Sequence, residues 1–109
     1  MGLDAAALAG NMLGAFKTQL VDKWPEIKTY GESEMKKLAQ TLVMIEQLKL
    51  SGEITKEQAK LHLQIQKNAV RVVMLTIEGL GLLAVEAAIN AALGVVKSAV
   101  NTALGFVLI

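Results

Sequence analysis

The sequence predicts an all-α protein, and three observations support this prediction. Aliphatic residues dominate a composition that is 53% hydrophobic and only 4% aromatic. Polar side chains recur at helical spacing through the second half of the chain, and the single proline stands early, at Pro25. A chain of 109 residues has the length of one domain. We therefore expect residues 1–109 to form a single α-helical domain.

The first two predicted helices meet at Pro25. One covers residues 3–24, with Asp4 as its N-cap and small residues filling its first half. The other covers residues 26–50 and contains most of the charged side chains. Proline is tolerated in the first turn of a helix but breaks or kinks a helix interior, so it separates the two segments.

The clearest boundary in the chain is Ser51-Gly52, which is a helix stop. Thr55 and Gln58 then fit a capping box, in which each side chain accepts from the backbone N–H of the other residue. A third, long helix is predicted over residues 55–104. Helices joined by so short a loop are expected to form an elongated antiparallel hairpin.

The length of the third helix leaves two alternatives open. Unbroken, it would be about 73 Å long, whereas a compact domain of this size has a radius of gyration of only about 13 Å. Either the helix breaks, at residues 79–81 or at Gly94, or the molecule is elongated and packs against neighbouring copies.

An eleven-residue register runs through the last third of the chain, where Asn68, Gly79, Asn90 and Asn101 begin successive blocks. Eleven residues in three turns keep one face of a nearly straight helix aligned. The predicted consequence is a narrow polar seam on an otherwise aliphatic helix. Its proposed members are Arg71, Glu78, Glu86, Asn90, Lys97 and Asn101.

The apolar surface of this helix exceeds what one partner helix covers, which predicts an interaction surface. We therefore expect a structural, self-assembling protein whose copies form a filament, tube or shell. Small residues that allow close helix packing, together with the apolar C-terminal segment, form the predicted interface. Its members are Ala84, Ala88, Ala91, Gly94, Gly105, Phe106, Leu108 and Ile109.

The alternative is a membrane-active helical protein, either a holin-like pore or a coat on a lipid or polyester granule. Residues 72–96 are long enough to span a bilayer, although two glutamates there would cost roughly 5 kcal/mol on insertion. The eleven-residue period over residues 57–109 resembles that of apolipoprotein-type and synuclein-type helices. Helices that lie on a membrane surface usually have a strongly charged, Lys-rich polar face, whereas this seam is sparse and mixed in sign.

Several function classes are disfavoured by composition. The net charge of +1 provides no basic field for nucleic acid, and the absence of cysteine removes thiolate chemistry. We expect no enzymatic activity and no cofactor or metal. His62 is interpreted as a core or interface residue rather than as a metal ligand with Glu46 and Glu57. No signal peptide is predicted, so a cytoplasmic or membrane-associated location is expected.

Overall fold

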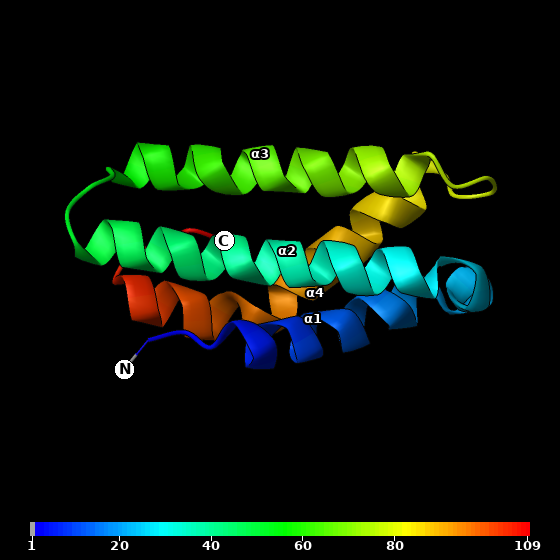
Figure 1. Cartoon of the computed structure of the whole chain (residues 1–109), viewed down its shortest axis with the longest axis horizontal. Coiled ribbons are helices and arrows are strands. Elements are labelled where there is room, and N and C mark those ends of the chain that lie inside the picture. Colours follow the sequence, from blue (N-terminus) through cyan, green and yellow to red (C-terminus); the bar gives the residue numbers. More distant parts are fainter. Residues whose placement is uncertain (1) are drawn as a thin grey trace.

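The computed structural model describes residues 2–109, whose regular structure is entirely helical. Four α-helices and one 3-10 turn follow one another along the chain (Figure 1). In order they are α1 (Ala5–Gln19), η1 (Val21–Lys23), α2 (Trp24–Leu50), α3 (Lys56–Leu75) and α4 (Leu82–Leu104). The all-α prediction is therefore confirmed.

The start of α1 is set by Asp4, as the sequence predicts. Its carboxylate accepts hydrogen bonds from the backbone N–H groups of Ala6 and Ala7, at 2.9 and 3.2 Å. These bonds satisfy two of the donors that every helix N-terminus leaves without a partner. The predicted end at residue 24 is wrong, because α1 stops at Gln19 and Trp24 already belongs to α2, whose first turn contains the proline.

The chain reverses direction between α2 and α3, and the two helices lie along each other (Figure 1). Gly52 adopts a φ of +77° in this turn, a conformation that glycine tolerates best. The predicted capping box then begins α3. The N–H of Gln58 donates to the Thr55 hydroxyl at 3.1 Å, and the N–H of Thr55 donates to the Gln58 side chain at 2.8 Å.

A continuous helix over residues 55–104 is wrong. The chain leaves the helix at Thr76 and re-enters it at Leu82, within the region where a break was one of the two alternatives. Gly79 has a φ of +90°, which no residue in an α-helix adopts, whereas Gly94 continues the helix. The molecule measures 42 × 22 × 18 Å with a radius of gyration of 13.7 Å, so the elongated shape is also wrong.

The break allows α4 to fold back behind α2 and to pack mainly along α1 (Figure 1). Both helices are rich in small residues, which permit a close approach of their backbones. One continuous core results. Its largest fully buried side chains are Phe16, Met12, Ile27, Met35, Leu38, Leu42, Ile45, Met74, Ile89, Val70, Val85 and Val96.

Candidate interaction surface

The predicted polar seam is partly assembled at the junction of α3 and α4. Arg71 donates from Nε to Oε1 of Glu86, an ion pair that joins the two helices. Arg71 also donates from Nη1 to Oδ1 of Asn68, and Gln64 donates to the same oxygen at 3.0 Å. The side chains of Gln64, Asn68, Arg71 and Glu86 thus form one network that links α3 to α4.

The electrostatics of this network are those of a partly exposed ion pair. The hydrogen bond from Arg71, with a smaller contribution from its charge, lowers the pKa of Glu86 below its ordinary value. The same bond raises the pKa of the Arg71 guanidinium. Both groups therefore remain charged near neutral pH, and the pair orients α4 relative to α3 rather than exchanging protons with a substrate.

The other predicted seam residues lie elsewhere. Glu78 is in the loop between α3 and α4, while Asn90 and Lys97 are exposed on α4. Asn101 is occupied by the C-terminal segment of its own chain. Its Oδ1 accepts from the backbone N–H groups of Leu108 and Ile109, at 2.8 and 3.1 Å. The structure therefore distributes the seam over four separate places.

The C-terminal segment, expected to pack against a neighbouring copy, is largely covered by its own chain. The side chain of Leu108 is buried in the core, and Phe106 and Ile109 pack against that core. The ammonium groups of Lys49 and Lys56 lie 6.0 and 5.7 Å from the centre of the Phe106 ring. These distances fit cation–π contacts, which hold the segment against the ends of α2 and α3.

Only part of the predicted α4 interface faces solvent. Ala88 is buried in the core, and Ala91 is half-buried. Ala84 and Gly94 are exposed, as is Gly105, which ends α4 with a φ of +77°. The exposed members belong to a face of small side chains that offers little apolar area per residue.

A larger apolar surface, which the sequence interpretation missed, lies on the outer side of α3. Four large aliphatic residues there are exposed although the helix is fully packed on its other side. The exposed fractions are 59% for Leu61, 58% for Ile65, 63% for Val72 and 38% for Leu75. We call these four residues, with Asn68 between them, the α3 stripe.

The geometry of α3 explains how it has two apolar faces. Ala59, Leu63, Val70 and Met74 are buried against the bundle. At 100° per residue the α3 stripe lies on the opposite side of the helix. In Figure 1, α3 forms one long edge of the molecule, so its outer side has no neighbouring helix. Immediately after the loop, Leu82 and Leu83 are also exposed.

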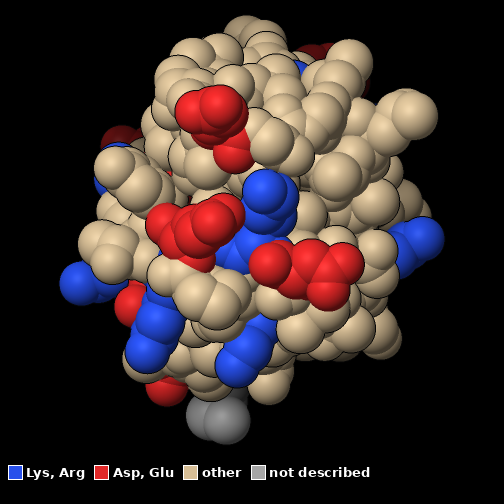
Figure 2. Space-filling model, turned by 90° about the vertical axis from the view of Figure 1, so that its right-hand side faces the viewer, with Lys and Arg blue, Asp and Glu red and all other residues tan. Residues whose placement is uncertain are grey.

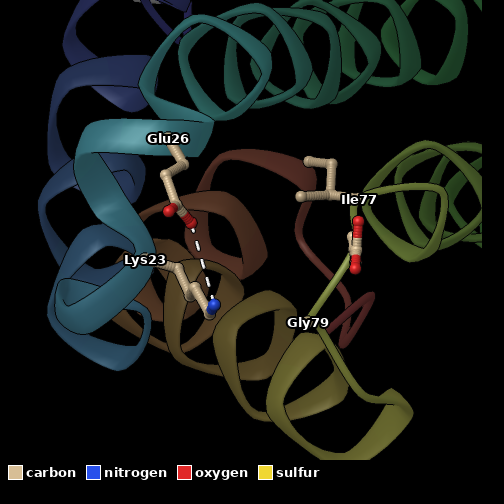
Figure 3. Close-up of a pocket in the computed structure, with 5 residues that line it drawn as sticks. Lys23, Glu26, Ile77 and Gly79 are labelled. Atoms are coloured by element: carbon tan, nitrogen blue, oxygen red, sulfur yellow. Dashed lines mark ion pairs between the residues drawn. The ribbon is translucent and has the colours of Figure 1, made fainter.

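The end of the molecule next to this loop is charged instead (Figure 2). A cleft of about 450 Å³ there is lined by Lys23, Glu26, Ile77, Glu78 and Gly79 (Figure 3). The Lys23 ammonium lies 3.7 Å from the Glu26 carboxylate. A Cβ atom at Gly79 would come within 2.8 Å of the Lys23 Nζ atom. Exposed pairs of this kind contribute about 0–1 kcal/mol.

The metal site considered for His62, Glu46 and Glu57 is not assembled among residues 2–109. No group of three or more His, Asp and Glu side chains there is placed to hold a metal ion. His62 is half-buried on α3, and Glu46 is buried on α2, where one carboxylate oxygen accepts from the backbone N–H of Leu3 at 2.8 Å. That bond ties the N-terminal segment to α2.

A signal for the α3 stripe is present in the sequence. The residues at 61, 65, 68, 72 and 75 are separated by four, three, four and three positions, which is the spacing of a coiled-coil seam. The eleven-residue register hides this spacing, because the register describes residues 55–104 as one helix with one polar side. Comparisons with protein-family models, with curated proteins and with solved structures found no match to this chain.

Proposed function

We propose that this chain is a structural module that associates with copies of itself through exposed apolar helix faces. The observation that supports it best is the α3 stripe, because its side chains stay exposed after the bundle has completed its own core. A folded chain gains little from placing large aliphatic side chains in a row toward water. Contiguous exposed apolar surface on a soluble protein usually marks an interaction site.

The small-residue face of α4 provides a second surface for assembly. Ala84, Ala87, Gly94 and Ser98 are exposed along it, and close helix approach is favoured where side chains are small. One self-complementary surface produces a closed dimer, whereas two different surfaces allow each copy to contact two neighbours. A filament, tube or shell would require both.

Sedimentation velocity of the untagged protein in detergent-free buffer tests the proposal. We expect the weight-average mass to rise above the 11.6 kDa of one chain as the concentration increases. A constant monomer mass up to about 1 mM would refute self-association, since a contact weaker than about 4 kcal/mol is of no structural use.

A membrane-active role is the second candidate, and one observation favours it. Among the helices of residues 2–109, α4 alone is long and apolar enough to cross a membrane. Its 23 residues would be about 35 Å long, compared with a hydrocarbon core of about 30 Å. In the folded bundle, however, one side of α4 supplies a large part of the core, so insertion would require the bundle to open.

Flotation with vesicles of phosphatidylcholine and phosphatidylglycerol separates the two candidates. A self-assembling protein is expected to remain in the dense fractions, with or without vesicles. Quantitative flotation that detergent reverses would instead support the membrane role. Glu86 and Lys97, the two charged residues of α4, would then be the first positions to substitute.

A further inference from the structure

The geometry points to a specific partner for the α3 stripe: the same stripe of a second copy, packed parallel and in register about a two-fold axis. This inference rests on the proposed function, because it specifies which surface associates and in which orientation. Three features of α3 support it: the choice of residue at each position of the stripe, the hydrogen bonds of Asn68 and the charges beside the stripe.

The stripe follows the rule for two-stranded parallel coiled coils. Ile65 and Val72 are β-branched and occupy equivalent a positions, seven residues apart. Leu61 and Leu75 occupy d positions, as does Asn68. β-Branched residues at a with leucine at d favour a parallel dimer over larger bundles.

Asn68 distinguishes the parallel from the antiparallel arrangement. Both hydrogen bonds that the structure gives its side chain use Oδ1 as the acceptor. Its amide N–H groups donate to no partner in these bonds, and in a parallel, in-register pair one of them can donate to the Asn68 oxygen that faces it, where it replaces the exposed Gln64 as a donor. In an antiparallel pair, a positions face d positions, and Asn68 would lie against the aliphatic Ile65. A polar group placed against an apolar side chain loses its hydrogen bond to water without a replacement.

The charges beside the stripe agree with the parallel register. In that register each g position faces the e position five residues later in the partner. Glu57 at g then faces His62 at e of the other copy, where a ring N–H can donate to the carboxylate. Arg71 faces a threonine, Thr76, and Gln64 faces an alanine, Ala69, so no like charges meet across the two flanks.

The bundle leaves room for this partner. The side of α3 that contacts α2 and α4 uses Leu63 and Val70 at f positions and Met74 at a c position, opposite the stripe. Pairing of two α3 helices therefore needs no change in the core. Because the helix is already formed in the monomer, association does not have to order it.

Cysteine cross-linking tests the arrangement in the full-length protein, which has no cysteine of its own. Leu61→Cys and Leu75→Cys would each place a thiol opposite its own counterpart at the two ends of the stripe. Val21→Cys is the matched control, because Val21 is 59% exposed but lies in η1, away from α3 and from the small-residue face of α4. Under mild oxidation we expect both α3 variants to form disulfide dimers at least about tenfold faster than the control.

Four results would overturn the inference. Cross-linking of a mixture of Leu61→Cys and Val72→Cys, without dimers of Leu61→Cys alone, would show an antiparallel pair. Equal rates for both α3 variants and Val21→Cys would show that the stripe is not the contact. If the wild type self-associates while neither α3 variant cross-links, only this inference fails. A monomeric wild type would refute the proposed function as well. Circular dichroism confirms that each variant is folded.

Discussion

Replacing one aliphatic side chain of the α3 stripe should weaken self-association without unfolding the protein. Ile65→Ser is the most informative change, because Ile65 lies at the centre of the stripe and is 58% exposed in the monomer. Fully burying such a side chain stabilises by about 1.5–3 kcal/mol. Burying its exposed part in a dimer is therefore worth about 1–2 kcal/mol for each copy.

Because both copies contribute, Ile65→Ser should cost about 2–4 kcal/mol of association free energy. This corresponds to a dissociation constant about 30–700 times larger, at about 1.4 kcal/mol for each factor of ten. The fold should be nearly unaffected, because serine and isoleucine have similar helix propensities and exposed substitutions change stability by about 0.5 kcal/mol or less.

Sedimentation velocity over a concentration series measures the dissociation constant, and thermal unfolding at low concentration measures the stability of the monomer. Val21→Ser is the control, since Val21 is exposed to nearly the same extent but lies in η1, away from both proposed surfaces. The reasoning is refuted if Ile65→Ser dissociates no more than Val21→Ser. It is also refuted if Ile65→Ser unfolds the monomer, because Ile65 would then belong to the core.

Three further predictions concern the fold itself. Gly31→Ala should destabilise the fold by about 1–3 kcal/mol, because the added Cβ would come within 2.9 Å of the buried ring of Trp24. Gly10→Ala should stabilise it by about 0.5–1 kcal/mol, because a Cβ there meets open space. Chemical denaturation measures the free energy of unfolding of both variants. Because the pKa of Glu86 is lowered in the folded state, its ion pair stabilises the fold above about pH 4.5, and this contribution is lost as the pH falls through the folded-state pKa. Glu86→Gln should therefore flatten the dependence of the free energy of unfolding on pH in that range. An unchanged pH dependence would contradict the assignment. Asn101→Ala should cost about 1–3 kcal/mol and should increase hydrogen exchange in the C-terminal segment, because two backbone N–H groups lose their acceptor, while Asn90→Ala on the exposed face should have little effect.

The predictions that held rest on signals within a few residues of one another. Asp4 caps α1, and Thr55 with Gln58 begins α3, because each cap needs only one side chain and the N–H groups of the following turn. The boundaries that failed involve distant partners. Gln19 ends α1 because the chain must turn for α2 to pack on it, and no local stop signal indicates that position.

The candidate interaction surface was only partly accessible from the sequence. The small residues of α4 were identified, but Ala88 turned out to fill the core. The α3 stripe was missed although its spacing is visible, because α3 also has a second apolar series at Leu63 and Val70. A sequence with apolar residues on two sides of a helix does not indicate which side faces the bundle.

The sequence alone determined that the chain is helical and that it has more apolar surface than a single helix pair can cover, because composition decides both properties. It also determined where the caps of α1 and α3 lie, because short-range hydrogen bonds decide them. Only the tertiary structure decided that the chain breaks at residues 76–81, that α4 folds back along α1 and that the stripe of α3 stays outside. The physical reason is competition between faces. Burial is favourable for any apolar face, and the face that becomes buried is the one whose shape fits α2 and α4 while the whole core closes.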